Sequence, residues 1–91
     1  TPNQFSLSQN YPNPFNPTTK IKFEISGSSA AQTFLSVYDM LGQEISTLVN
    51  EELKPGTYEV DWNASDFPSG VYFYKLETEY FTETKRMILL K

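Results

Sequence analysis

The chain has 91 residues, which is enough for one modest hydrophobic core and too little for two. It contains no cysteine and no histidine, which excludes disulfides, thiolate metal sites, cysteine nucleophiles and histidine acid–base chemistry. Seven basic against eleven acidic side chains give a net charge of −4, which argues against a nucleic-acid binder held by phosphate contacts. We find no signal peptide and no apolar run of about 20 residues, and since the sequence opens with Thr1 we expect a piece of a longer protein.

The first predicted elements are a short strand and a proline-rich segment. Phe5 and Leu7 predict the strand. Residues 10–17, Asn-Tyr-Pro-Asn-Pro-Phe-Asn-Pro, contain three prolines, which fix φ and exclude a regular strand. We therefore expect residues 1–18 to form a Pro/Asn-rich entry segment, a stiff, extended spacer that holds a preceding linker away from a sandwich body at residues 19–91.

Alternation of apolar and polar residues predicts the next three strands, over residues 20–25, 34–38 and 45–49. Between the last two, residues 39–42, Asp-Met-Leu-Gly, predict a hairpin turn. The aspartate carboxylate can accept backbone N–H groups at the entry of such a turn, and the glycine can take a positive φ without a Cβ clash.

The second half of the chain predicts three further strands, over residues 57–62, 71–76 and 81–90. Residues 54–57, Lys-Pro-Gly-Thr, match a type II turn with proline second and glycine third. The strand at 71–76 has apolar residues on both faces, so we expect it to be central and covered on both sides. The final turn, residues 77–80, lacks a glycine, which leaves its geometry open.

Seven strands, no helix and an aromatic content of 15% predict an all-β fold, a seven-stranded Ig-like antiparallel β-sandwich. The strand faces predict which side chains point into the core. These are Ile21, Phe23, Leu35, Val37, Ile45, Val60, Trp62, Tyr72, Tyr74 and Leu76.

Two sets of residues with side-chain oxygens are weak candidates for chemistry. Asp61, Asn63 and Asp66 could ligate calcium through oxygen atoms, but the spacing is not that of an EF-hand, and loop capping is the commoner role. Glu51 and Glu52 could form an acid pair, but adjacent residues on a strand point to opposite faces. The sequence therefore predicts neither a metal site nor a catalytic site.

Aromatic side chains offer a second kind of candidate. Tyr11, Phe15, Tyr80 and Phe81 could stack on a sugar, although packing at a sandwich edge is the commoner explanation. Residues 63–65 match a glycosylation sequon, which is weak evidence. Residues 69–72, Ser-Gly-Val-Tyr, resemble the tyrosine corner of immunoglobulin-type domains, where a tyrosine hydroxyl bonds to nearby backbone.

The last residues place an apolar strand between basic ends. On physical grounds alone the favoured reading is an ordinary final strand with charged residues that discourage edge pairing. A recognition role is the alternative, and it involves Lys85, Arg86, Met87, Ile88, Leu89, Leu90 and Lys91.

Four segments together resemble the type IX secretion system C-terminal sorting domain, type A, of Bacteroidetes and related phyla. They are residues 11–19, 37–45, 55–62 and 69–76, the last followed by 85–87. The residues that carry the resemblance are Pro12, Asn13, Pro14, Phe15, Asn16, Pro17, Tyr38, Asp39, Gly42, Gly56, Trp62, Gly70 and Tyr72. The related Ig-like domain of flagellar hook-capping proteins shares the Tyr-Asp-x-x-Gly turn and the Gly-x-Tyr strand. It is not expected to carry the proline block, so it ranks second.

The resemblance implies that residues 1–91 are a single C-terminal sorting domain, which directs an attached cargo across the outer membrane and is removed by a sortase-like protease. It implies no enzymatic activity and no cofactor. The implied partners are the outer-membrane translocon, the protease and an upstream cargo domain, and the implied route leads through the periplasm to the cell surface or the medium. A carbohydrate-binding or structural Ig-like accessory module of a secreted enzyme is the alternative.

A hypothesis about recognition follows from these two readings of the last strand. Residues 85–91 would be an exposed edge that the translocon reads by strand pairing. Removal of the last five residues is then expected to stop secretion and to leave much of the fold.

Overall fold

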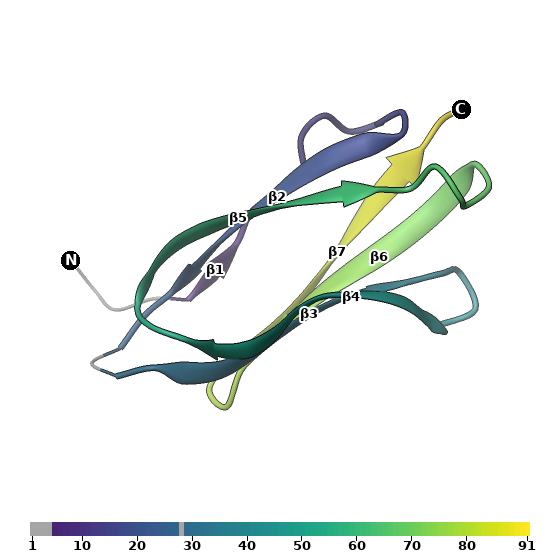
Figure 1. Ribbon diagram of the computed structural model, residues 1–91. Coiled ribbons are helices and arrows are strands. Elements are labelled where there is room, and N and C mark those ends of the chain that lie inside the picture. The colour runs from purple at the N-terminus through teal and green to yellow at the C-terminus, as the bar shows by residue number, and fades with distance from the viewer. Residues whose placement is uncertain (1–4, 28) are drawn as a thin grey trace.

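The computed structural model describes residues 5–27 and 29–91, which form seven strands in two antiparallel sheets (Figure 1). The described residues contain no helix, hence none that could cross a membrane. The predicted all-β sandwich is confirmed. One sheet has the order β1-β2-β5, with β1 (Ser6–Leu7), β2 (Thr18–Ile25) and β5 (Gly56–Asn63). The other has the order β4-β3-β6-β7, with β4 (Glu44–Leu53), β3 (Ala31–Tyr38), β6 (Gly70–Glu77) and β7 (Thr82–Leu89).

Strand β2 shows how the sequence pattern produces the sandwich. Its residues alternate between exposed and buried along the whole strand, because successive side chains of a strand point to opposite faces. The buried face includes Ile21 and Phe23 and packs into the core. On the other face, Lys20 and Lys22 each lie 3.8 Å from the carboxylate of Glu59 on the neighbouring β5. The pattern therefore fixes both the inner and the outer face of this sheet.

The core contains most of the predicted side chains and several others. Ile45 and Val60 are only partly buried and pack against the core, whereas the other eight predicted side chains are buried. The largest additions are Phe15, Met87 and Leu89, which are at most 2% exposed. Phe15 comes from the proline-rich segment, so that segment contributes to the core.

The turn at residues 39–42 forms as its residue types predict. The Oδ1 atom of Asp39 accepts hydrogen bonds from the backbone N–H groups of Leu41 at 2.9 Å and Gln43 at 3.0 Å. Gly42 has a φ of +85°, which a residue with a Cβ rarely adopts. Strands β3 and β4 flank this turn and pair with each other, so it is a hairpin turn.

The prediction of a type II turn at residues 54–57 is wrong. Gly56 has a φ of 157° instead of about +80°. It begins β5, where it pairs with Ile25 of β2. Since β4 and β5 belong to different sheets, the chain crosses here from one sheet to the other and does not form a hairpin. The hydroxyl of Tyr58 donates a hydrogen bond to the carbonyl of Lys54 across this crossover.

Strand β6 is central in its sheet, as predicted, but it is not covered on both sides. Its outward side chains Val71 and Phe73 are only half-buried. The turn that follows β6 has no glycine and uses Thr78 instead. The N–H of Thr78 donates to the carbonyl of Phe81 at 2.7 Å, and its hydroxyl accepts from the N–H of Tyr80 at 3.1 Å. A threonine side chain therefore closes the turn.

Candidate functional site

The molecule is long, 41 × 23 × 16 Å, and its most distinctive sequence segments meet at one end. We call this the motif end, and it comprises residues 10–17, the turn 39–42, the loop 64–69 and residues 90–91 (Figure 1). The opposite end carries the turn 78–81 and the crossover at 54–55. Of the residues that carry the family resemblance, Gly56 alone lies at the opposite end.

The proline-rich segment lies along β7 and does not act as a spacer. The N–H of Phe15 donates to the carbonyl of Ile88, and the N–H of Leu90 donates to the carbonyl of Phe15, both at 2.9 Å. The Oδ1 atom of Asn13 accepts from the N–H of Ile88 at 3.0 Å. The peptide bonds before the three prolines of this segment are cis. The expected spacer is therefore wrong, because the segment is part of the sandwich.

A buried polar network holds the start of this segment. The N–H of Asn10 donates to the hydroxyl of Tyr74 at 2.8 Å, and that hydroxyl donates to the carbonyl of Ser8 at 2.7 Å. The side-chain amide of Asn10 donates to the hydroxyl of Thr19 at 2.9 Å. Sequence reasoning missed this anchor. The available signal was Tyr74, an inward-facing tyrosine whose hydroxyl needs a partner.

This environment changes the acidity of Tyr74. Burial is the main reason that the pKa of its phenol rises to about 12. The negative charge of Glu83 raises the pKa further, and the hydrogen bond from Asn10 opposes the rise. Tyr74 is therefore a neutral structural anchor at physiological pH.

Aromatic rings close the motif end from inside. The ring of Trp62 lies 5.8 Å from those of Phe15 and Tyr72 and 5.6 Å from that of Phe67, measured between centroids. The hydroxyl of Tyr72 donates to the carbonyl of Pro68 at 2.6 Å, as the tyrosine corner predicts. Burial, with a contribution from the charge of Asp39, raises the pKa of Tyr72. Phe15, Trp62 and Tyr72 therefore build this end from within.

The seven residues predicted for recognition differ in how far they are buried. Met87 and Leu89 have no exposed surface and belong to the core. Lys85 is half-buried and lies 3.2 Å from the carboxylate of Glu83. The side chains that reach the surface more fully are those of Arg86, Leu90 and Lys91, with Ile88 half-buried.

The free edge of β7 is covered where these residues lie. In addition to the bonds from Asn13 and Phe15 to Ile88 and Leu90, the side-chain amide of Gln9 donates to the carbonyl of Arg86 at 2.7 Å. Strand addition requires unpaired backbone groups at an edge. The hydrogen bonds from residues 9–15 already occupy backbone groups of β7 from Arg86 to Leu90.

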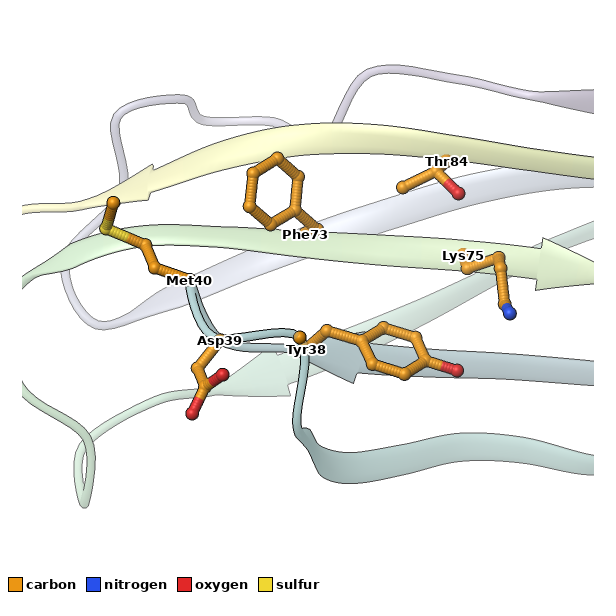
Figure 2. Close-up of a pocket in the computed structure, with 7 residues that line it drawn as sticks. Tyr38, Asp39, Met40, Phe73, Lys75 and Thr84 are labelled. Carbon is orange, nitrogen blue, oxygen red and sulfur yellow. The ribbon is translucent and has the colours of Figure 1, made fainter.

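An open groove of about 260 Å³ lies on the outer face of the four-stranded sheet, beside the turn 39–42. Figure 2 shows the ring of Phe73 between Met40 and Thr84, with Lys75 further along the same strand and the ring of Tyr38 on the neighbouring strand. The Nζ atom of Lys75 lies 5.3 Å from the centroid of the Tyr38 ring, within the range of a cation–π contact. The carboxylate of Asp39 points away from these side chains, because it caps the turn (Figure 2).

The weaker candidates do not come together as sites. The Oδ1 atom of Asn63 caps its own loop by accepting from the N–H of Ser65 at 2.9 Å. Within residues 5–27 and 29–91, no cluster of three or more acidic side chains could hold a metal ion. Glu51 and Glu52 are exposed on β4. Among the proposed sugar-stacking aromatics, Phe15 is buried in the core and Phe81 stacks on Phe5 at 5.7 Å.

A family model described as secretion system C-terminal sorting domain matches residues 9–90 of the chain. The chain belongs to this family. A search of curated proteins found no match. The sorting domain is the C-terminal sorting signal for type IX secretion, as the resemblance implied. Membership implies interaction with the type IX machinery, a place C-terminal to a cargo, and export to the cell surface or the medium.

Proposed function

We propose that the secretion machinery recognises the sorting domain at its motif end, through side chains and not through the backbone edge of β7. The observation that carries this is the meeting of segments 10–17, 39–42 and 90–91 at one end of a long molecule. Large hydrophobic side chains exposed at this end include those of Met40 (70%), Leu41 (84%) and Leu90 (55%), and Tyr11 is exposed there as well. Exposed apolar side chains gathered in one region are typical of protein–protein contact sites.

The coverage of β7 supports recognition by side chains. Backbone groups at Arg86, Ile88 and Leu90 already have partners in residues 9–15. The end of the chain is also held in place, since the N–H of Lys91 donates to the hydroxyl of Ser69 at 2.9 Å. Of the residues 85–91 that the sequence predicted for recognition, we therefore retain Arg86, Ile88, Leu90 and Lys91 as surface contacts for the secretion machinery. Lys85, Met87 and Leu89 support the fold.

The domain acts in this proposal as an address label without catalytic activity. Its two tyrosines with raised pKa values, Tyr72 and Tyr74, donate hydrogen bonds to backbone carbonyls, which supports a structural role for both. The folded domain would travel through the periplasm, present its motif end to the translocon, and be removed by a sortase-like protease.

The test is an export assay on residues 1–91 fused behind a periplasm-targeted fluorescent protein, in a host with a type IX system. Leu41→Ser changes an exposed side chain at the motif end, and Tyr80→Ser is the matched control, since Tyr80 is 77% exposed at the opposite end. We expect Leu41→Ser combined with Leu90→Ser to lower translocon-dependent export about tenfold. Tyr80→Ser should leave export unchanged.

Two results would contradict the proposal. Equal export of all variants would show that the motif end is not read. A folded fusion that stays in the periplasm of both the host and its translocon mutant would favour an accessory role, carbohydrate-binding or structural.

A further inference from the structure

A row of three side chains crosses the outer face of the four-stranded sheet beside the groove. Phe73 of β6 lies opposite Tyr38 of β3 on one side and Arg86 of β7 on the other. Residues directly opposite on antiparallel strands place their side chains on the same face, with Cβ atoms about 4.5–5.5 Å apart. The register therefore puts Arg86 on the same face as Phe73 and directly beside it, so its long side chain starts next to the groove that Phe73 lines.

Arg86 is the cation of this face that is available to a ligand. Its side chain is exposed, and it makes no ion pair with any residue in the described part of the chain. By contrast, Lys75 in the groove lies 3.7 Å from the carboxylate of Glu77. Asp39, the acidic residue of the groove, directs its carboxylate away from Phe73 (Figure 2). In a chain of net charge −4, a cation without an ion pair among the described residues thus lies on the neighbouring strand, beside Phe73 of a largely apolar groove.

We infer that this groove binds a partner peptide that places one large apolar side chain against Phe73 and a carboxylate against Arg86. A volume of about 260 Å³ lies below the range of about 300–1,000 Å³ that is usual for small-molecule pockets, and it suits a single side chain. Guanidinium groups bind carboxylates through two parallel hydrogen bonds, so Arg86 would hold a carboxylate that lies next to the apolar side chain. The inference rests on the proposed function only where it assigns the peptide to the secretion machinery.

Binding can be measured on the 91-residue chain without that machinery. Three synthetic peptides with capped ends serve as probes: Gly-Asp-Phe-Asp-Gly, its basic counterpart Gly-Lys-Phe-Lys-Gly, and Gly-Asp-Gly-Asp-Gly. Titrations followed by amide chemical shifts give both the affinity and the location of binding. We expect the acidic phenylalanine peptide to bind about tenfold more tightly than either of the others. The shifts should centre on Tyr38, Phe73 and Arg86.

Variants test the role of the cation. Arg86→Glu should weaken the acidic phenylalanine peptide about tenfold or more, and Arg86→Gln, which keeps the length and polarity but loses the charge, should have an intermediate effect. Lys54→Glu makes the same charge reversal at an exposed position of the opposite end and should change nothing. Thermal unfolding of each variant checks that it is folded.

The outcomes separate this inference from the proposed function. Equal affinity for the three peptides, unchanged affinity of both Arg86 variants, or shifts centred elsewhere would overturn the groove as a peptide site. If Leu41→Ser with Leu90→Ser lowers export but Arg86→Glu leaves export intact, the role of the groove in secretion is overturned. Specific peptide binding by a domain that shows no translocon-dependent export would instead overturn the proposed function.

Discussion

The two edges of the four-stranded sheet differ in how their backbone groups are satisfied. Along β7, the side-chain amide of Gln9 and the N–H of Phe15 donate hydrogen bonds, and the Oδ1 atom of Asn13 and the carbonyl of Phe15 accept them. Along β4, the described structure shows no strand other than β3. This second edge carries the acidic residues Glu44, Glu51 and Glu52, and charges discourage pairing with another strand. The domain thus protects one edge with its own chain and the other with charge.

The comparison changes how the C-terminal strand can be read. A covered edge offers side chains and turns to a partner, whereas an open edge offers its backbone. Four predictions test how much the covered edge contributes to the fold.

The largest effect is expected from removal of residues 87–91. This deletion takes away Met87 and Leu89, both fully buried, together with the residues to which Asn13 and Phe15 are bonded. The loss of two such side chains costs about 4 kcal/mol or more in the free energy of unfolding. We expect circular dichroism to show no cooperative thermal transition. A shortened chain that still melts cooperatively, as the sequence-based hypothesis expected, would show that the covered edge is dispensable.

Phe15→Ala is the next strongest change. The ring is 2% exposed and packs against Trp62, so its loss leaves a cavity worth about 3–5 kcal/mol. Tyr11→Ala is the matched control in the same segment, since Tyr11 is 80% exposed and its loss should cost within about 0.5 kcal/mol. Urea unfolding measures both. Similar costs for the two variants would mean that the segment is not anchored through Phe15.

A pH dependence follows from the raised pKa of Tyr74. The unfolded chain loses the phenol proton near pH 10, whereas the folded protein keeps it up to about 12. The stabilising contribution is therefore complete below pH 10 and is lost as the pH rises toward 12, by about 2 kcal/mol. Urea unfolding at several alkaline pH values checks this. In Tyr74→Phe most of this decrease in the free energy of unfolding should disappear. An unchanged decrease would mean that other groups cause it.

The smallest effect contrasts two asparagines, one at each edge. Asn13→Ala removes the acceptor for the N–H of Ile88 and should cost about 1 kcal/mol. Asn50→Ala on β4 removes an exposed bond from Gln32 at 3.2 Å and should cost less than about 0.5 kcal/mol. Chemical denaturation resolves this difference. Equal costs would remove the distinction between the two edges.

Local patterns in the sequence predicted the local structure. Strict alternation in β2 predicted which residues face the core, because the period of two depends only on neighbouring residues. The turn 39–42 followed from its aspartate and glycine, whose preferences are equally local. The tyrosine corner at Tyr72 was predictable for the same reason.

The candidate site was less predictable, because its contacts join distant parts of the chain. Asn13 and its partner Ile88 lie 75 residues apart, and nothing in the local sequence of either indicates the other. The prolines correctly excluded a regular strand at 10–17, but they said nothing of where the segment packs. The prediction of a type II turn at Gly56 failed for a related reason. A Pro-Gly pair favours a turn locally, whereas long-range pairing decides that β4 and β5 belong to different sheets.

The elongated shape has a mechanical consequence. Phe5 stacks on Phe81 beside the turn at the opposite end, whereas Leu90 bonds to Phe15 at the motif end. If a cargo pulls from the first end while a partner holds the second, the tension runs lengthwise along β7. Its hydrogen bonds to β6 and to residues 9–15 are then sheared together and not peeled one after another. The fold should therefore resist stretching along its long axis, which is the direction in which an attached cargo would pull on it.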